Sequence, residues 1–538
     1  MKINYDSALA RLDRFIERQM RATGLPGMAV ALTDRHRLLR VSTYGLANLE
    51  ARTPVTPETL FEIGSISKSF TCILLLQLQE EGYLSVHDPV TRHLPWFQVL
   101  SSYDPIALHH LMSHTAGIVR GTEFTGEAKY ETWILRHTQA SSAPGTRFYY
   151  SNTGYKVLGL VLEAVTGQLY ADLLQERILT PLGMMATHPV ITHRTREGLA
   201  VGYQPFYDDR PWPRSGKLAP APWQETATAD GSIAATPADL AVYLRTLMNR
   251  AQMPEGQLLS ENTFALMTQK IIRKEGQENE FYGYGLCTQE SDGHTIMGHN
   301  GSMVGYRAHI LADLEEGFGA VVMINGPGEP KKVADYALKL LRSAQQGRNL
   351  PSLPLDDPTR VKNATDYVGT FRSDKKQLTF TARGENLILH HGGEQIRLEK
   401  RDADQFLIPH PDFSLFLLSF QRNEGRVFEA FYGADWYVHE DYTGPITFDY
   451  PPEWNAYLGH YRSYNPWYSN FRVVLRKGDL WLIHASGLEH RLVPLSKDLF
   501  CVGEKENSPE RIHFETILNH QAIRANFSCG DYYRTFTP

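Results

Sequence analysis

Cysteine is scarce, with only four in 538 residues. No two of them form a C-x-x-C pair, which excludes a zinc ribbon or a thioredoxin motif. The number is also too small for a disulfide scaffold. We therefore expect buried, reduced thiols that act as small hydrophobic side chains. The four residues are Cys72, Cys287, Cys501 and Cys529.

Basic clusters and long apolar runs are also missing. The chain has 54 Lys and Arg against 60 Asp and Glu, a net charge of −6. This balance argues against a nucleic-acid binder and against a polybasic membrane anchor. The most apolar run, 70–78, is far shorter than the ~18 residues of a membrane span, and no secretory signal is visible at the N-terminus. We expect a soluble, cytoplasmic protein with neither nucleic acid nor membrane as a partner.

Motifs for cofactors and metals are absent from the sequence. It contains no G-x-G-x-x-G, no P-loop and no G-x-S-x-G elbow. His110 and His114 lie four residues apart, but Leu111 stands where H-E-x-x-H has its glutamate. We therefore predict no cofactor and no metal, and expect these two histidines to serve local packing and hydrogen bonding.

Residues 1–347 mix strand and helix patterns. Apolar runs predict a hairpin near each end, and helical spacing of apolar residues predicts helices between and after them. Strands at both ends with helices between favour one α+β domain around a central antiparallel sheet flanked by helices. The hairpins are predicted at 28–44 and 306–324, and the helices at 65–81, 152–165 and 330–345.

The rest of the chain has a different texture. Residues 348–358 are Pro-rich and indicate a linker, and short alternating segments broken by Gly, Asn and Asp follow. The segment YVGTFRS at 367–373 recurs as YLGHYRS at 457–463. We therefore predict two similar modules, 359–450 and 451–538, each a small antiparallel β-barrel of about eight strands.

The first candidate for chemistry is Gly64-Ser65-Ile66-Ser67-Lys68, where a loop enters an apolar helix. Residues three apart share a helix face, so Ser65 and Lys68 should be in contact. A serine hydroxyl needs a base to become a nucleophile, and a desolvated lysine can serve as one. An N-cap serine with a surface lysine is the alternative.

The second candidate is Tyr150-Ser151-Asn152, which follows a turn and precedes a predicted helix. A tyrosine beside a lysine ammonium can have a lowered pKa and relay protons to a leaving group. An asparagine amide can orient both substrate and lysine. The alternative is a packed tyrosine with an asparagine helix cap.

The third candidate is His299-Asn300-Gly301-Ser302, just before the strand predicted to begin at Tyr306. Gly301 would let a substrate backbone approach closely, and His299 could donate a hydrogen bond to substrate or to Tyr150. The alternative is a loop histidine at a strand edge.

Taken together, S-x-x-K, Y-x-N and H-x-G in this order resemble the serine β-lactamase and penicillin-binding-protein superfamily. The resemblance is closer to its class C-like branch, which includes D-aminopeptidases, D-amino-acid amidases and family VIII carboxylesterases. Residues 111–117 and 181–184 match as well, and the resemblance covers about 10–345. The two trailing modules resemble the lipocalin-like barrels of bacterial D-aminopeptidases.

The resemblance implies a role for each motif residue. Ser65 would be acylated, Lys68 would support its deprotonation, and Tyr150 would act as general base and acid. Substrate would be bound by Asn152, by His299 in place of the lysine of K-T-G, and by Gly301 and Ser302. The backbone N–H groups of Ser65 and Ser302 would form the oxyanion hole, whose donors stabilise the transition state by several kcal/mol.

His299 departs from the K-T-G pattern because histidine carries no fixed charge at pH 7. The change weakens the case for a β-lactamase or carboxypeptidase and favours substrates without a carboxylate there. We predict a metal-free serine hydrolase, an aminopeptidase or amidase acting on small or D-configured amino-acid amides and peptides. The alternatives are a carboxylesterase acting on short acyl esters, a penicillin-binding or sensor protein with poor turnover, and a scaffold with vestigial catalysis.

The resemblance to barrel-bearing D-aminopeptidases also implies a loop that reaches the active site. The candidates are 464–470 and the acidic 503–510, with an exposed hairpin tip as the alternative. An acidic group there could bind the ammonium of a substrate. The natural substrate, the stereopreference and the oligomeric state, including a homodimer, stay open.

Overall fold

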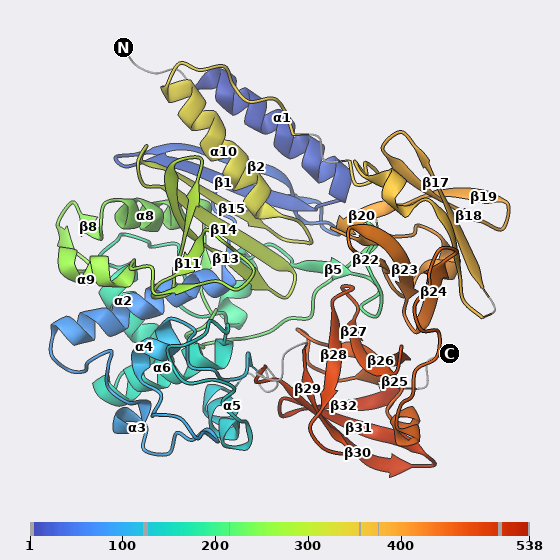
Figure 1. Ribbon diagram of the computed structural model, residues 1–538. Helices are drawn as coiled ribbons and strands as arrows, with labels where there is room; N and C mark the ends of the chain where they lie inside the picture. The colour runs from blue at the N-terminus through green and yellow to red at the C-terminus, as the bar shows by residue number, and fades with distance from the viewer. Residues whose placement is uncertain are drawn as a thin grey trace. The chain divides into compact units, whose positions relative to one another are not determined.

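The chain forms two compact units. One contains residues 1–204 and 217–354, and the other contains 205–216 and 355–538. The computed structural model describes residues 5–121, 127–214, 216–354, 357–374, 376–503 and 508–535 (Figure 1).

The first unit is built on a nine-stranded antiparallel sheet in the order β10-β11-β12-β13-β14-β15-β1-β2-β3. Both predicted hairpins are present, as β1–β2 and β14–β15, and they meet in the middle because β1 pairs with β15. This confirms the expected α+β domain with a central antiparallel sheet. The strands are β1 Gly27–Asp34, β2 Leu38–Asn48, β3 Thr53–Pro54, β10 Ile272–Arg273, β11 Glu280–Tyr282, β12 Cys287–Ser291, β13 His294–Met303, β14 Tyr306–Asp313 and β15 Phe318–Ile324.

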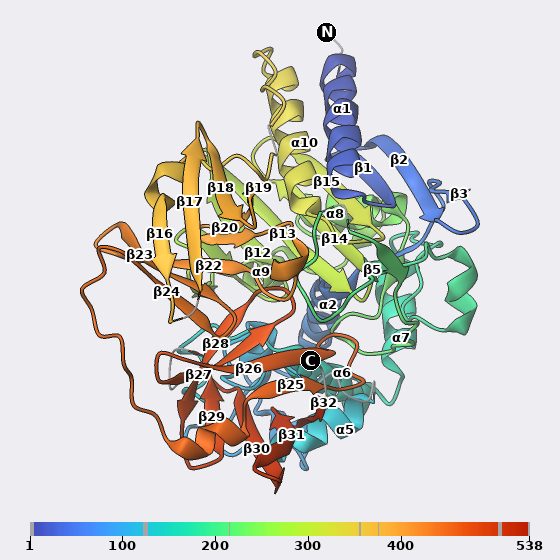
Figure 2. The ribbon, with the colours of Figure 1, turned by 90° about the vertical axis from the view of Figure 1, so that its right-hand side faces the viewer.

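Helices cover both faces of this sheet. The terminal helices α1 (Asp6–Thr23) and α10 (Pro330–Gln345) lie side by side on one face, as Figure 1 and Figure 2 show. Phe15 on α1 packs against Tyr336 on α10, and the centres of the two rings are 4.7 Å apart. Because side chains alternate along a strand, β1 directs Met28, Val30 and Leu32 to this helix pair and Ala29 and Ala31 to the main core on the other face.

The main core contains the helices that carry two of the three motifs. Helix α2 (Ser67–Glu80) is buried along most of its length and follows a single 3₁₀ turn, Gly64–Ile66. The predicted helix at 65–81 therefore begins two residues late, and Ser65 lies in the turn. Helix α6 (Asn152–Thr166) ends at Gly167, whose φ of 72° suits a glycine C-cap. The other helices here are α3 Val90–His93, α4 Leu108–Met112, α5 Ala128–Trp133, α7 Tyr170–Leu174, α8 Pro237–Met248 and α9 Glu261–Met267.

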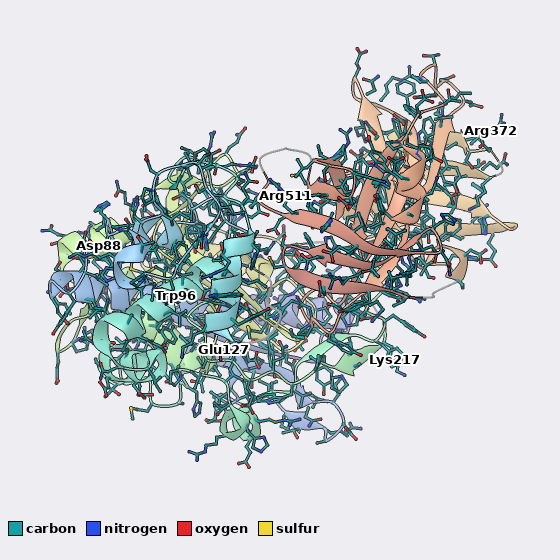
Figure 3. All side chains as sticks on the ribbon, turned by 90° about the horizontal axis from the view of Figure 1, so that it is seen from below. Asp88, Trp96, Glu127, Lys217, Arg372 and Arg511 are labelled. Atoms are coloured by element: carbon teal, nitrogen blue, oxygen red, sulfur yellow. The ribbon has the colours of Figure 1, made fainter. Side chains whose placement is uncertain are left out.

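The second unit contains two barrel-like sheets, marked in Figure 3 by Arg372 on the first and Arg511 on the second. The C-terminal sheet is a closed barrel of β25 to β32. Its strands are β25 Gly459–Arg462, β26 Asn470–Arg476, β27 Asp479–His484, β28 Glu489–Pro494, β29 Leu499–Val502, β30 Arg511–Leu518, β31 Gln521–Phe527 and β32 Gly530–Thr535.

The first of these sheets has nine strands in the order β19-β18-β17-β16-β24-β23-β22-β21-β20. Its two edge strands, β19 and β20, are neighbours in sequence and are separated only by Leu398. Its strands are β16 Gly369–Arg372, β17 Gln377–Arg383, β18 Asn386–His391, β19 Glu394–Arg397, β20 Glu399–Asp402, β21 Gln405–Leu407, β22 Leu418–Asn423, β23 Arg426–Tyr432 and β24 Asp435–His439.

The sequence repeat has a structural counterpart. The Tyr367 hydroxyl donates to the carbonyl of Ala403 at 3.2 Å, and the Tyr457 hydroxyl donates to that of Lys497 at 3.0 Å. In both modules the tyrosine before the first strand therefore forms a hydrogen bond with an equivalent loop, which follows β20 in the first module and β28 in the second. The first module differs in that its fourth strand is broken at Leu398 into β19 and β20.

Segment 205–216 belongs to the second unit although it is distant from it in sequence. Asp208 accepts hydrogen bonds from Arg462 at 2.5 Å and Ser469 at 2.8 Å, and its backbone carbonyl accepts one from Asn470 at 2.9 Å. The end of the predicted loop 464–470 is thus engaged with this segment. Of the other predicted loop, residues 504–507 lie outside the described residues. That either loop reaches an active site stays a prediction.

No single helix among the described residues has both the length and the apolar character needed to cross a membrane. The pair Asn152–Thr166 and Tyr170–Leu179 meets the criterion only when joined, and it is bent by 85°.

Candidate active site

Ser65 and Lys68 lie in contact at the start of α2. The Lys68 Nζ donates to Ser65 Oγ at 3.0 Å and to the backbone carbonyl of Asp230 at 2.7 Å. The lysine side chain is fully buried, so the alternative of a surface lysine is wrong. The contact arises because residues three apart share a face where the 3₁₀ turn runs into the helix. The result is a desolvated amine bonded to a serine hydroxyl.

Tyr150 lies against the same pair. The Lys68 Nζ is 5.1 Å from the centre of its ring. Burial raises the pKa of Tyr150 well above its usual value, and a hydrogen bond with Ser65 and the charge of Arg120 oppose this rise only in part. The expected lowering of this pKa by the lysine is therefore wrong, because desolvation outweighs the nearby charges. At neutral pH Tyr150 is a phenol, which can donate its proton but is not the resting-state general base that the resemblance implied.

The Tyr150-Ser151-Asn152 segment is held by Ser151. Its hydroxyl accepts the Gly154 N–H at 3.0 Å and donates to the Val119 carbonyl at 2.7 Å, so Ser151 is the N-cap of α6. The alternative of an asparagine cap is therefore wrong. Asn152 is the first residue of the helix, directly after Tyr150-Ser151, and its backbone N–H donates to the Arg120 carbonyl at 2.6 Å.

The third motif lies within a strand rather than before one. Residues His299 to Ser302 belong to β13, which pairs with β14. The backbone at Gly301 passes so close to the 3₁₀ turn that a Cβ there would stand 1.8 Å from the Ile63 carbonyl oxygen and 3.4 Å from the Ser65 nitrogen.

The same close approach is seen from the other side of the contact. A Cβ on Gly64 would stand 2.7 Å from the Ser302 nitrogen. Two glycines thus let the backbones of β13 and the 3₁₀ turn meet. The N–H groups of Ser65 and Ser302, the pair implied for the oxyanion hole, come from these two segments.

His299 is neutral and engaged on both nitrogens. Its Nδ1 lies 2.6 Å from the Asn300 carbonyl and must donate to it, so its Nε2 accepts from the Tyr282 hydroxyl at 3.0 Å. Burial lowers the pKa of His299 to about 3, and the charge of Lys68 acts in the same direction. This agrees with the expectation that no fixed charge replaces the lysine of K-T-G. The described contacts of the ring are with Tyr282 and Asn300 rather than with Tyr150.

Two further residues complete the site, and the motifs did not reveal them. One is Tyr282, the partner of His299. The other is His114, whose Nδ1 accepts the Ser151 N–H at 3.1 Å and whose ring lies 4.1 Å from that of Tyr150. Burial, and then the charge of Lys68, lower the pKa of His114 well below its usual value. The expectation of packing and hydrogen bonding holds, but the packing partner is Tyr150.

His114 also adopts an unusual backbone conformation. Its φ is +57°, in the left-handed region that non-glycine residues rarely adopt. His110 differs, because its Nδ1 accepts the nearby Ala107 N–H at 3.0 Å and serves only the start of α4. The one signal that could have singled out His114 is its place in the matching stretch 111–117.

Groups of side chains that could hold a metal ion lie elsewhere among the described residues. They are His391, His410 and Asp412 in the second unit, and His294, Asp313 and Glu315 in the first. Neither group includes a residue of the Ser65 site.

An antiparallel sheet flanked by helices, with a serine hydrogen-bonded to a buried lysine at the start of a core helix, defines a β-lactamase-like domain. The model of the Beta-lactamase family matches residues 12–344. The chain therefore belongs to this family of β-lactamase-like serine hydrolases, as the motifs predicted, and its two C-terminal barrel-like sheets confirm the resemblance in layout to D-aminopeptidases.

Similar proteins come from several bacteria and an archaeon. Penicillin-binding protein 4* of Bacillus subtilis is 26% identical over 397 residues, 66% of this chain and 82% of that protein. D-aminopeptidase of Gluconobacter oxydans is 27% identical over 333 residues, 60% of this chain and 59% of that protein. The structure of the octameric penicillin-binding protein homologue from Pyrococcus abyssi is 27% identical with a TM-score of 0.61, and the match covers 81% of this chain and 99% of that one.

The close contact between β13 and the 3₁₀ turn predicts that adding one methyl group at Gly301 lowers catalytic activity. Gly301→Ala must push the two backbones apart and displace the Ser302 N–H, so we expect kcat/KM to fall about 100-fold, the effect of losing one oxyanion donor. Gly293→Ala on the same hairpin, where no atom lies within 4 Å of the new Cβ, should cost about 1 kcal/mol of stability and keep activity. Steady-state kinetics and thermal melts check both, and an active Gly301→Ala enzyme would contradict the role of this contact.

His114 is expected to position Tyr150. His114→Ala removes the acceptor for the Ser151 N–H and the ring behind Tyr150, so kcat should fall by about 10-fold or more with little change in KM. His114→Asn keeps a side-chain acceptor and tolerates the positive φ, so it should recover part of the loss. His110→Ala is the matched control. Equal kcat values for the two alanine variants would refute this assignment.

Proposed function

We propose that the protein is a serine hydrolase that forms an acyl-enzyme on Ser65. The observation that carries the proposal is the buried Lys68 Nζ, 3.0 Å from Ser65 Oγ, with the Tyr150 phenol beside both. An amine held out of water next to a hydroxyl can take its proton. A phenol that keeps its proton can protonate a leaving group.

The reaction follows from these positions. With Lys68 as the neutral amine, its Nζ takes the proton from Ser65 as Oγ forms a bond to the substrate carbonyl carbon, and the resulting oxyanion is bound by the N–H groups of Ser65 and Ser302. Tyr150 then gives its proton to the leaving nitrogen or oxygen while the bond to carbon breaks, and Lys68 returns a proton to Tyr150. Water attacks the acyl-enzyme by the same route and releases the acid and free Ser65.

The preferred substrates are small or D-configured amino-acid amides and peptides. A neutral His299 offers no fixed charge to a substrate carboxylate, and the similarity to a D-aminopeptidase supports the same class. Two alternatives use the same residues. One is a carboxylesterase acting on short acyl esters, and the other is a penicillin-binding protein with poor turnover, which the similarity to the Bacillus and Pyrococcus proteins favours.

A substrate panel tests the proposal and ranks the alternatives. p-Nitrophenyl acetate and butyrate report esters, D- and L-alanine p-nitroanilide report amides, and nitrocefin reports β-lactams. Ser65→Ala should lower turnover of every active substrate by about 10³-fold or more and abolish the acyl adduct seen in intact mass. Ser67→Ala is a matched control, because the Ser67 hydroxyl accepts a hydrogen bond from the Ile233 N–H. Turnover retained in Ser65→Ala would overturn the mechanism.

A further inference from the structure

A buried carboxyl group without a partner lies just before the nucleophile. Glu62 is 5% exposed on the short strand β4 (Phe61–Glu62), which pairs with β7 (Ala234–Ala235). No described residue forms a hydrogen bond or ion pair with its side chain. Burial alone raises the pKa of Glu62 to about 8. A buried carboxylate is costly unless it is paired, so ionisation of Glu62 is unfavourable without a cationic partner.

Glu62 lines a small cavity of about 110 Å³ within the first unit. The Arg196 guanidinium that also lines it lies 5.1 Å from the Trp223 ring, and the Tyr306 hydroxyl donates to the Ala200 carbonyl at 2.6 Å. The Trp223 Nε1 is buried without a hydrogen-bond partner. Of the polar groups that line the cavity, the indole N–H of Trp223 is buried and unsatisfied, and the Glu62 carboxyl has no hydrogen bond to a described residue.

The cavity wall is continuous in sequence with the candidate active site. Glu62 precedes Ser65 by three residues, so their Cα atoms lie at most about 11 Å apart. Val304 and Tyr306, which also line the cavity, lie two and four residues after Ser302 in the chain. The two segments that meet at Gly64 and Gly301 therefore also form part of this cavity.

We propose that Glu62 binds a primary ammonium group of the substrate in this cavity. The inference rests on the proposed function and specifies its substrate class. An ammonium group supplies the missing counter-charge and up to three hydrogen-bond donors, and the cavity has room only for a small cationic end. The ammonium is the α-amino group of the scissile residue or one at the end of a longer acyl chain, and substrates of different length distinguish the two.

Binding of an ammonium group by Glu62 should depend on pH. The carboxyl must ionise to bind a cation, and ionisation follows as the pH rises through about 8. The charged or titratable groups that face it from neighbouring elements are Arg196 on the turn before Leu199 and Tyr306 on β14. A primary alkylammonium at the end of an acyl chain keeps its charge to about pH 10, whereas an α-ammonium loses it at about pH 8. Binding of a terminal alkylammonium should therefore strengthen between pH 7 and 9, binding of an α-ammonium should be strongest at about pH 8, and a neutral ligand of the same shape should show neither change.

The first experiment compares matched cationic and neutral acyl groups on the full chain. 4-Aminobutyryl and pentanoyl p-nitroanilide differ only in an ammonium against a methyl group, and glycyl and β-alanyl p-nitroanilide test shorter spacings. We expect at least a 10-fold preference in kcat/KM for an ammonium-bearing substrate, measured at pH 9 for the 4-aminobutyryl group and at about pH 8 for the two shorter groups, because an α-ammonium loses its charge near that pH. Glu62→Gln should abolish the preference, Glu62→Asp should keep part of it, and the exposed Glu58→Gln should leave it unchanged. A preference that survives Glu62→Gln overturns the proposal.

The second experiment separates this inference from the proposed function. Propylammonium is measured as an inhibitor of p-nitrophenyl acetate hydrolysis, with 1-propanol as the neutral control, and its binding is measured by calorimetry. Glu62→Gln should weaken propylammonium at least 10-fold. If esters turn over but propylammonium binds no better than propanol, the inference fails and the hydrolase stands. If no substrate turns over but propylammonium binds the parent chain and not Glu62→Gln, the hydrolase fails and the cation site stands.

Discussion

The site depends on one backbone contact, the approach of β13 to the 3₁₀ turn before α2. Neither segment tolerates a Cβ at the point of contact, because a side chain at Gly301 or Gly64 would collide with the opposite main chain. The contact brings N–H groups from two distant parts of the sequence together. It also fixes where Ser65 lies relative to the sheet, and hence where Lys68 and Tyr150 must meet it. The geometry is carried by main chain, which side-chain fluctuations disturb little.

Burial, more than any ion pair, sets the charge of the surrounding groups. It raises the pKa of Tyr150 and Glu62 and lowers that of His299 and His114. All four shifts favour the uncharged form, as desolvation requires. Tyr150, His299 and His114, which lie near Lys68, are therefore uncharged at neutral pH. In such a medium a charge that develops on a substrate interacts strongly with the few dipoles aimed at it.

Much of this could be predicted from the sequence, because local signals determine it. Apolar spacing located both hairpins and the helices, a repeat exposed the paired β modules, and the separation of Ser65 and Lys68 by three residues fixed their contact. What failed depended on the rest of the fold. Desolvation of Tyr150 is a property of its surroundings and reversed the expected direction of its pKa. The pairing of β13 with β14 placed His299 inside a strand.

Other residues carried no local signal at all. His114 resembled any loop histidine until its ring was found against Tyr150, and Tyr282 stood out only through its hydrogen bond to His299. Glu62 lies in an apolar run, where a single acidic residue is typical of a strand edge. That its carboxyl has no partner among the described residues is visible only in the three-dimensional structure. The break at Leu398 lies in a segment whose sequence counterpart, around Leu492, forms an unbroken strand.

Segment 205–216 has a consequence for how this chain can be divided. Because it belongs to the C-terminal unit, the polypeptide crosses between the units three times, after Gln204, Gly216 and Pro354. A protease that cut only after Pro354 would leave segment 205–216 on the N-terminal fragment. The contacts of this segment with the C-terminal fragment would still hold the two fragments together. A truncated chain ending at Pro354 would instead leave Asp208 without its hydrogen-bond donors Arg462 and Asn470. The C-terminal unit is thus built from two separate stretches of the chain, and biochemical work on either unit needs the whole polypeptide.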